Sequence, residues 1–287
     1  MSFLSWQGLG KTFEAIAGAI LYNSIRCERG LVHLPNVVVL PNDQVMHQWQ
    51  DELVQCGVSR ERSLVYRDDA TLQGFDFVLV TRYTIQTEVK RIFDLYNSKA
   101  LLASFRYKCG LSKLFPQVNL EMLLNLKAHY ESNMGRSGRL QSANENIGDT
   151  LTLLFQRCAK RMESRAQVFG MVIFDEAHLL RNRCTLWGIG GGLLSMHATR
   201  RVPMTGTPYN NSFNDLATLM AFIDSSEPSA YSSKFWDHMA TPWFNTAVKD
   251  WRRKFMVRRR KDILRNTLPE KHVLRDIQRP FKAELCV

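Results

Sequence analysis

The sequence lacks the features of several protein classes. No apolar run is long enough to cross a bilayer, and the N-terminus has no basic segment followed by an apolar stretch and a small-residue cleavage site. We therefore expect neither a membrane partner nor secretion. The six cysteines lie far apart, with no CxxC and no paired Cys/His spacing. This distribution argues against a zinc site and indicates reduced thiols in an intracellular protein.

Positive charge, in contrast, is abundant. The chain has 287 residues and a formal net charge of +11, and its length is enough for one large domain or two small ones. Between residues 249 and 282 there are thirteen Lys or Arg and four Asp or Glu, a local net charge of +9. A basic stretch of this kind favours a polyanionic partner, of which nucleic acid is the commonest. The alternative is a solvated basic surface without a partner.

Four short apolar runs predict strands, at 37–40, 77–80, 171–174 and 202–204. The first three have the composition of strands buried on both faces, as in a parallel sheet, whereas a proline interrupts the fourth. Predicted helices lie at 12–25, 43–55 and 213–223. Strands alternating with helices predict a doubly wound α/β lobe, in which ligands bind beyond the carboxyl ends of the strands.

The segment 90–168 departs from this alternation. Apolar residues recur there at helical spacing, in stretches such as LEMLLNLKAHY and LTLLFQRCAKRM. Residues 133–150 are polar and rich in glycine, serine and asparagine, which predicts a loop. We interpret 90–168 as a helical insertion carried on the lobe and not as a separate domain. It is either a docking site or a tolerated excursion from the surface.

The stretch GLGKT near the N-terminus has the pattern of a phosphate-binding loop. Gly8 and Gly10 allow backbone N–H groups to turn toward phosphate oxygens, Lys11 would neutralise the β- and γ-phosphates, and the Thr12 hydroxyl would ligate magnesium. The full pattern asks for glycine at position 5, where this chain has Ser5. The alternative is a glycine turn that opens a helix by chance.

The tetrapeptide DEAH (175–178) follows the apolar run MVIF. Two carboxylates follow a buried strand, downstream of a phosphate loop. Such a pair can share metal binding and the activation of water between its two members. Asp175 would hold the metal through water, and Glu176 would orient or deprotonate the attacking water. A surface acidic turn is the alternative for this tetrapeptide alone.

The segment TGTP (205–208) also follows an apolar run. Thr205 and Thr207 are small hydroxyl residues at a place where the nucleotide state could be sensed. They would equally serve as turn formers ahead of Pro208.

Six segments occur in a fixed order along the chain: GLGKT, VVVLPNDQVMHQWQDEL, DFVLVTRYT, VIFDEAH, RVPMTGTPYNNSFNDLATLMAFI and FMVRRRKDILRNTLPEK. In this order they resemble the ATPase motor of the SWI/SNF-type chromatin-remodelling family of helicase superfamily two. The most specific pieces are the spacing of Pro41, Trp49 and Glu52, the TGTPxNNxxxDL run, and FMVRR followed by LPEK. The last piece separates this family from the RNA helicases that share the DEAH box.

The resemblance implies a RecA-like three-layer lobe with a mostly parallel central sheet, and it assigns roles to residues. ATP would be bound by Gly8, Leu9, Gly10, Lys11 and Thr12. Thr12 and, through water, Asp175 would hold Mg²⁺. Lys11, Asp175 and Glu176 would drive hydrolysis, and His178, Thr205, Gly206 and Thr207 would couple the nucleotide state to DNA.

The resemblance also places Gln48, Trp49, Thr81 and Arg82 near the tracked DNA strand. For Trp49 a purely structural alternative remains open, in which the indole packs a helix onto the sheet. The basic run 258–261 resembles a nuclear-import signal, although in the family this segment packs at the end of the first lobe.

The resemblance divides the chain into an ATP-binding lobe at 1–272, with the insertion 90–168, and the start of an inter-lobe connection at 273–287. The second RecA-like lobe, with its arginine finger, is expected to be missing from this chain. The chain also departs from the family at Ser5, Trp6 and Gln7, where an aspartate, an acidic residue and a methionine are usual. This departure bears on the strand that leads into the phosphate loop.

The function implied by the resemblance is that of a DNA-dependent ATPase, a translocase on double-stranded DNA in the nucleus, in chromatin remodelling or repair. The isolated chain is expected to turn over ATP very slowly. The alternative, from another class, is a nucleotide- and DNA-binding fragment that no longer turns over. A DEAH-type RNA helicase is disfavoured by the FMVRR…LPEK segment.

Overall fold

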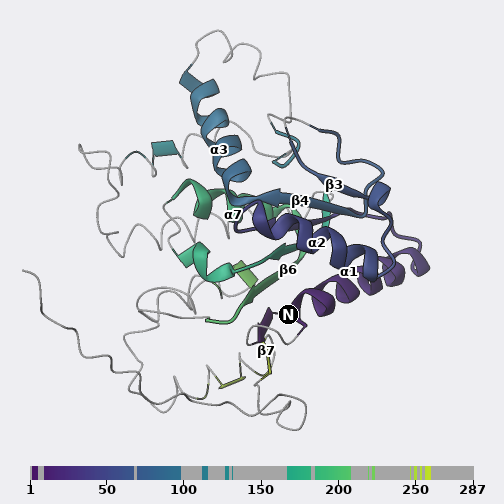
Figure 1. Cartoon of the computed structure of the whole chain (residues 1–287). Coiled ribbons are helices and arrows are strands. Elements are labelled where there is room, and N and C mark those ends of the chain that lie inside the picture. Colours follow the sequence, from purple (N-terminus) through teal and green to yellow (C-terminus); the bar gives the residue numbers. More distant parts are fainter. Residues whose placement is uncertain are drawn as a thin grey trace, which may run out of the picture.

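The structure is a computed structural model of the chain (Figure 1). It describes residues 2–5, 10–67, 70–97, 112–115, 127–128, 131, 167–181, 185–207, 219, 222–223, 246, 249–250, 253 and 256–259. For residues 2–5, 95–97, 181 and 258–259 only the backbone is described. Among the described residues, no helix has both the length and the apolar character needed to cross a membrane.

The centre of the fold is a sheet of seven strands in the order β3-β4-β2-β5-β6-β1-β7. The strands are β1 (Ser2–Ser5), β2 (Asn36–Leu40), β3 (Ser63–Val65), β4 (Phe77–Thr81), β5 (Phe169–Phe174), β6 (Ala198–Thr205) and β7 (Met256–Arg259). Every described pair of neighbouring strands is parallel. The predicted parallel α/β sheet is thereby confirmed.

Helices cover both faces of this sheet. They are α1 (Lys11–Glu28), α2 (Gln44–Gln55), α3 (Arg82–Asn97) and α7 (Leu186–Met196), with short 3-10 helices η1 (Arg60–Arg62) and η2 (Ala177–Arg181). Buried residues of α1 and α2 share one core cluster, and those of α3 and α7 share the other, so the four helices lie in pairs on opposite faces (Figure 1). The result is the three-layer arrangement that was predicted.

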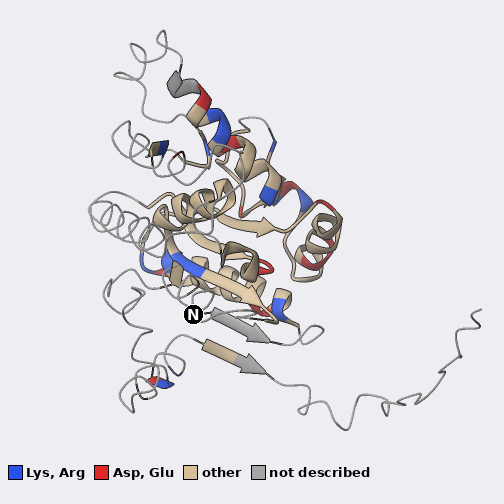
Figure 2. Ribbon diagram, turned by 90° about the vertical axis from the view of Figure 1, so that its left-hand side faces the viewer, with Lys and Arg blue, Asp and Glu red and all other residues tan. Residues whose placement is uncertain are grey.

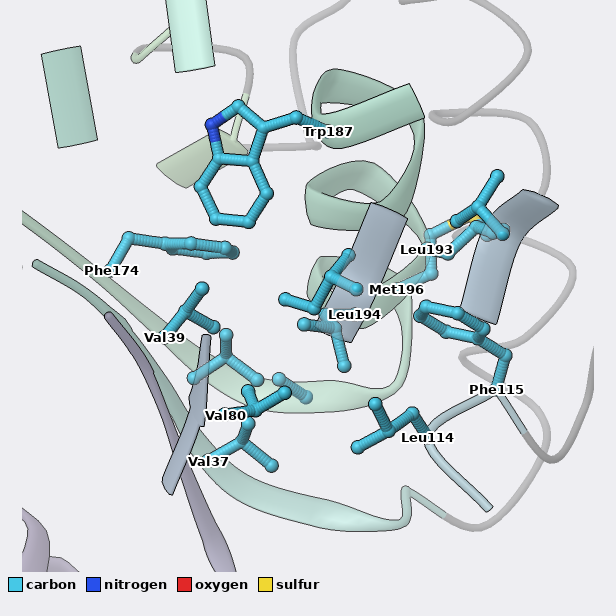
Figure 3. Packing of buried hydrophobic residues seen from close by; sticks show 14 of the residues in the cluster. Val37, Val39, Val80, Leu114, Phe115, Phe174, Trp187, Leu193, Leu194 and Met196 are labelled. Carbon is cyan, nitrogen blue, oxygen red and sulfur yellow. The ribbon is translucent and has the colours of Figure 1, made fainter. Parts of the chain in front are cut away.

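The side chains of the central strands alternate between the two core clusters. Val38 lies level with Leu79 of β4 and Ile173 of β5, and all three belong to the cluster under α1 and α2. The next row, Val39 with its neighbours Val80 and Phe174, faces α7 instead (Figure 3). Burial of each such side chain contributes about 1.5–3 kcal/mol. This two-sided burial is why these strands are continuous apolar runs.

All four predicted strands are present, the proline-interrupted one included. Pro203 lies opposite Phe174 of β5, and the pairing of β6 with β1 begins only at Met204. Strand β1 ends at Ser5, one of the positions at which the chain departs from the family. It nevertheless pairs with β6 on one side and β7 on the other. Strands β1, β3 and β7 were not predicted.

The helix predictions have comparable outcomes. The predicted helix 12–25 is α1, which is longer at both ends, and 43–55 is α2, which begins one residue later. Of the predicted helix 213–223, residues 219, 222 and 223 are helical and the others lie outside the described residues. Helix α7 was not predicted.

Two described parts of the interpreted insertion, 90–168, contribute to the core. Helix α3 runs through residue 90 to Asn97, and its residues Ile92 and Phe93 are buried. Leu114 and Phe115 are fully buried in the same cluster (Figure 3). The predicted loop 133–150 lies outside the described residues. The boundaries of the insertion and of the lobe remain predictions.

Candidate functional site

The carboxyl ends of β1, β5 and β6 lie at one edge of the sheet. β6 pairs with β5 through Phe174↔Pro203 and with β1 through Leu4↔Thr205. Because the strands are parallel, the segments that follow them leave the sheet at this edge, where ligands of α/β sheets bind. In the sheet order β6 lies between β1 and β5, so two strand spacings, about 10 Å, separate the latter two. The predicted phosphate loop and the predicted acidic pair therefore start from the same edge.

Gly10 is the N-cap residue of helix α1 and has a φ of 75°, in the left-handed region. Glycine is favoured here by this conformation, and a Cβ atom would meet no atom of the described residues within 4 Å. Among the described residues, no side chain caps the start of this 18-residue helix. Lys11 and Thr12 are its first two residues, both half-buried. A helix N-terminus of this kind attracts anions, phosphate among them. Gly8 and Leu9 lie outside the described residues.

Asp175 follows β5 directly and is held by three hydrogen bonds. Its backbone N–H donates to the Val39 carbonyl oxygen, at 2.9 Å. Its Oδ1 accepts the backbone N–H of Glu176, at 2.9 Å, and its Oδ2 accepts the indole N–H of Trp49, at 3.0 Å. Both oxygens of this half-buried carboxylate thus have a donor. The bond from Trp49 was not predicted.

Glu176 is the one non-glycine residue with a positive φ in the described part of the chain, at 48°. The left-handed conformation costs such a residue about 1–2 kcal/mol, and strained residues of this type cluster at functional sites. The turn takes the chain from the end of β5 into η2, which begins at Ala177. A Glu176 carboxylate oxygen, Oε2, lies 3.1 Å from Nδ1 of His178.

His178 links this acidic segment to the end of β6. The same Nδ1 atom lies 3.1 Å from the hydroxyl oxygen of Thr205, which is 1% exposed. That oxygen also accepts the backbone N–H of Thr207, at 3.1 Å. A carboxylate only accepts, so the contact with Glu176 is attractive when Nδ1 carries a proton, and the Thr205 hydroxyl then accepts too. Glu176, His178, Thr205 and Thr207 therefore form one connected chain, beside the exposed Gly206.

The four residues predicted near DNA have different surroundings. Gln48 is exposed and donates to Glu52, at 2.8 Å. Thr81 is buried and hydrogen-bonded to Thr84, and the Arg82 guanidinium lies 5.3 Å from the ring centroid of Tyr83.

Trp49 is 1% exposed and belongs to the core cluster of α1 and α2. Burial keeps its ring from touching a DNA strand at the surface. The position fits the packing alternative that the sequence left open.

The donor set at this edge suits magnesium. In the described part of the chain no group of three or more His, Cys, Asp or Glu residues could hold a metal ion. Magnesium bound with a nucleotide does not need one, because phosphate oxygens and waters complete its octahedron beside one or two protein ligands. The Thr12 hydroxyl is an oxygen ligand of the required kind, and the Asp175 carboxylate is an acceptor for the waters bound to the metal. The residues present therefore fit a magnesium–nucleotide complex.

Comparison with known proteins identifies the fold's family. The pattern of the SNF2-related domain matches residues 7–275. The chain belongs to the SNF2-related domain family. The predicted resemblance is confirmed, and this SNF2-related domain is a first RecA-like lobe. It is 28% identical over 171 residues to the ATP-dependent helicase fft2 of Schizosaccharomyces pombe, a match that covers 52% of the chain and 13% of the helicase.

A further curated protein and a solved structure are similar to this SNF2-related domain. It is 23% identical over 220 residues to the DNA repair protein RAD5 of Yarrowia lipolytica, covering 77% of the chain and 16% of that protein. A solved structure of the Sulfolobus solfataricus SWI2/SNF2 ATPase core in complex with dsDNA shares its fold, with a TM-score of 0.50 and 18% identity. That match covers 91% of this chain and 40% of the other. The domain thus spans less than a fifth of the length of these curated relatives.

Proposed function

We propose that this SNF2-related domain binds and hydrolyses ATP as the first lobe of a DNA-dependent ATPase that translocates on double-stranded DNA. The observation that carries the proposal is the connected chain Glu176–His178–Thr205, at the sheet edge where the segment of Lys11 also starts. A carboxylate joined to a second strand end by an imidazole is suited to report the state of the nucleotide to the rest of the molecule. The setting would be chromatin remodelling or DNA repair in the nucleus.

The chain's own residues divide the work as follows. The turn at Gly8, Leu9 and Gly10, with the start of α1, would bind the phosphates through backbone N–H groups. Lys11 would balance the charge of the β- and γ-phosphates. Bound Mg²⁺ supplies further neutralisation of that charge, and Thr12 and Asp175 would hold it. Glu176 would orient the attacking water and accept its proton.

Double-stranded DNA is the proposed partner, in a chromatin context. The fold is shared with an ATPase core solved in complex with dsDNA, and the chain carries a net charge of +11. Contacts from basic and polar side chains to phosphates fix grip and orientation without reading sequence. The exposed Gln48 and the half-buried Arg82 stay as proposed contacts, together with the backbone near Thr81.

Nucleotide binding and hydrolysis test the proposal separately. In the full chain, Lys11→Ala should weaken the binding of a fluorescent ATP analogue about 10–100-fold, because a hydrogen bond to a charged group is lost. Glu176→Gln should bind the analogue normally and lower the hydrolysis rate about 10²–10⁴-fold from its slow basal value, because the proton acceptor is lost. Unchanged affinity in Lys11→Ala would remove the loop from the site.

Adding different nucleic acids to the assay distinguishes a DNA-dependent ATPase from an RNA helicase and from a binding unit without turnover. Duplex DNA should stimulate hydrolysis more than RNA of equal length. Stimulation by RNA alone would identify an RNA helicase instead. Binding of ATP and DNA without measurable turnover would identify a binding unit that needs a second lobe to supply the cation for phosphoryl transfer.

A further inference from the structure

Trp49 and Asp175 join two elements that lie far apart in the sequence. The indole N–H of Trp49, on α2, donates to Oδ2 of Asp175 at 3.0 Å, across 126 positions. Trp49 is 1% exposed, within the buried stripe of α2 that it forms with Met46 and Leu53. The ring is therefore fixed by packing before it meets the carboxylate.

The bond matters because of what each partner offers. An indole has one N–H and no acceptor, so its donor points in a direction set entirely by the ring. A carboxylate has about four lone-pair sites, two on each oxygen. In Asp175 one site on Oδ1 is taken by the Glu176 N–H and one on Oδ2 by Trp49. Two donors on different oxygens fix the rotation of the carboxylate about the Cβ–Cγ bond of Asp175. The other lone pairs stay available to a ligand.

We propose that Trp49 is a positioning residue for the metal side of the site, and that its indole N–H holds the Asp175 carboxylate in the orientation that meets hydrated Mg²⁺. The proposal rests on the proposed function, in which Asp175 serves bound nucleotide and Mg²⁺. It gives the buried tryptophan a role beyond packing, and one that does not require contact with DNA. Hydrogen-bond partners of metal-binding groups typically change metal affinity 10–100-fold when they are removed.

Trp49→Phe is the decisive variant, because phenylalanine keeps an aromatic ring in the core and removes the donor. Trp187 provides the matched control. It is 4% exposed and packs edge-on against Phe174, with ring centroids 6.4 Å apart. Its indole nitrogen is buried and has no hydrogen-bond partner within the described part of the chain. Trp187→Phe therefore removes the same atoms from the core without removing a hydrogen bond.

The readout is the affinity of the full chain for a fluorescent ATP analogue, first in EDTA and then along a Mg²⁺ titration. For Trp49→Phe we expect an EDTA affinity within twofold of the wild type and a half-saturating Mg²⁺ concentration at least tenfold higher. For Trp187→Phe we expect neither quantity to change. The positioning role would be overturned if the half-saturating Mg²⁺ concentration (the metal midpoint) were unchanged in folded Trp49→Phe. It would also be overturned if Trp187→Phe shifted this concentration by the same factor.

The same experiment separates failure of the inference from failure of the proposed function. If the wild type binds no nucleotide, or binds it as well after Lys11→Ala, the proposed function fails and the inference falls with it. If the wild type binds in a Mg²⁺-dependent way and Trp49→Phe leaves the metal midpoint unchanged, only the inference fails.

A second measurement tests the proposal even if Trp49→Phe does not fold. In the wild-type chain carrying ¹⁵N-labelled tryptophan, one indole N–H resonance should move in Asp175→Asn, which identifies it as Trp49. We expect that resonance to shift when Mg²⁺ is added to the nucleotide-bound chain, and we expect no shift with EDTA. A Trp49 resonance insensitive to Mg²⁺ would overturn the proposal.

Discussion

His197 lies directly after α7 with 1% of its surface exposed. Its Nδ1 lies 2.6 Å from the Leu193 carbonyl oxygen, which can only accept, so this nitrogen carries the proton. Its own carbonyl oxygen accepts the backbone N–H groups of Val168 and Phe169 at the start of β5. Burial lowers the pKa of His197 from 6.5 to about 4, although the bond to Leu193 acts in the opposite direction. The ring is therefore neutral in the folded chain at neutral pH.

This burial predicts a pH dependence of stability. The unfolded chain takes up a proton on His197 below about pH 6.5, whereas the folded chain does so only near pH 4. The free energy of unfolding should therefore fall as the pH falls from 6.5 to 4, by an amount on the order of 3 kcal/mol from this residue. Urea unfolding at pH 7, 5.5 and 4.5 measures the slope. His197→Gln should be less stable at pH 7 but show a shallower slope, and an equal slope would contradict the assignment.

At the residue scale, the sequence pointed to candidate site residues but not to the contacts between their side chains. Lys11, Asp175, Glu176 and Thr205 stand in short local patterns whose residue types already imply their chemistry. Which side chains touch depends on strand order and turn geometry, as in the positive φ of Glu176. The bond from Trp49 to Asp175 has no local signal at all, because packing of α2 decides whether that indole faces the surface or the strand end.

Among the elements, α7 carries the tightest approach, at Gly190. A Cβ on this residue would lie 2.2 Å from Cγ2 of Ile85 and 3.1 Å from Cγ2 of Val89, both on α3. The absence of a side chain is what allows the two helices to pack so closely over the sheet. We expect Gly190→Ala to lower the free energy of unfolding by about 1–3 kcal/mol, the usual cost of overpacking, despite the better helix propensity of alanine.

Gly18 of α1 is the matched control for Gly190. It too lies inside a helix, but a Cβ there would meet no atom within 4 Å in the part of the chain that the structure describes. Gly18→Ala should be neutral or stabilising by up to about 1 kcal/mol. In an Ile85→Ala background the cost of Gly190→Ala should shrink, because the clashing methyl group is gone. Denaturant unfolding of the wild type, Gly190→Ala, Ile85→Ala and the double variant measures this coupling. Additive effects on the free energy of unfolding would contradict the contact.

The same helix shows why some elements escaped prediction. The sequence LWGIGGGLLSM contains four glycines, which weaken the helical signal. Two of them are explained only by tertiary packing, Gly190 against Ile85 of α3 and Gly191 against Leu180 of η2. Strands β1, β3 and β7 have three or four residues each, too few for a periodic pattern. The strands of the buried centre were predictable because apolar burial on both faces leaves a continuous run in the sequence.

At the scale of the whole molecule, strands β2, β3, β4 and β5 contain no charged residue, whereas β6 carries Arg200 and Arg201. Figure 2 shows the central strands mainly tan apart from a blue stretch on β6, and most of the other blue and red lies on helices and in the segments between elements. The family and the parallel sheet could be predicted because their signals are order and composition along the chain. The part played by the basic stretch 249–282 could not, because only a few of its residues are described, and its charge alone does not distinguish a DNA-binding face from a solvated one.

Salt dependence of DNA binding decides between these two roles. If phosphates are neutralised by this stretch, log K for duplex DNA should fall linearly with log salt concentration, by about 0.9 for each phosphate contacted. Replacing the exposed Lys249 and Arg253 by alanine should then reduce the slope by about 2. Arg60→Ala is the control, because Arg60 is exposed, pairs with Asp51 at 3.3 Å and lies beside β3, at the opposite end of the strand order from β7. Equal slopes in all three chains would show that DNA is held elsewhere and that the basic stretch is solvated surface.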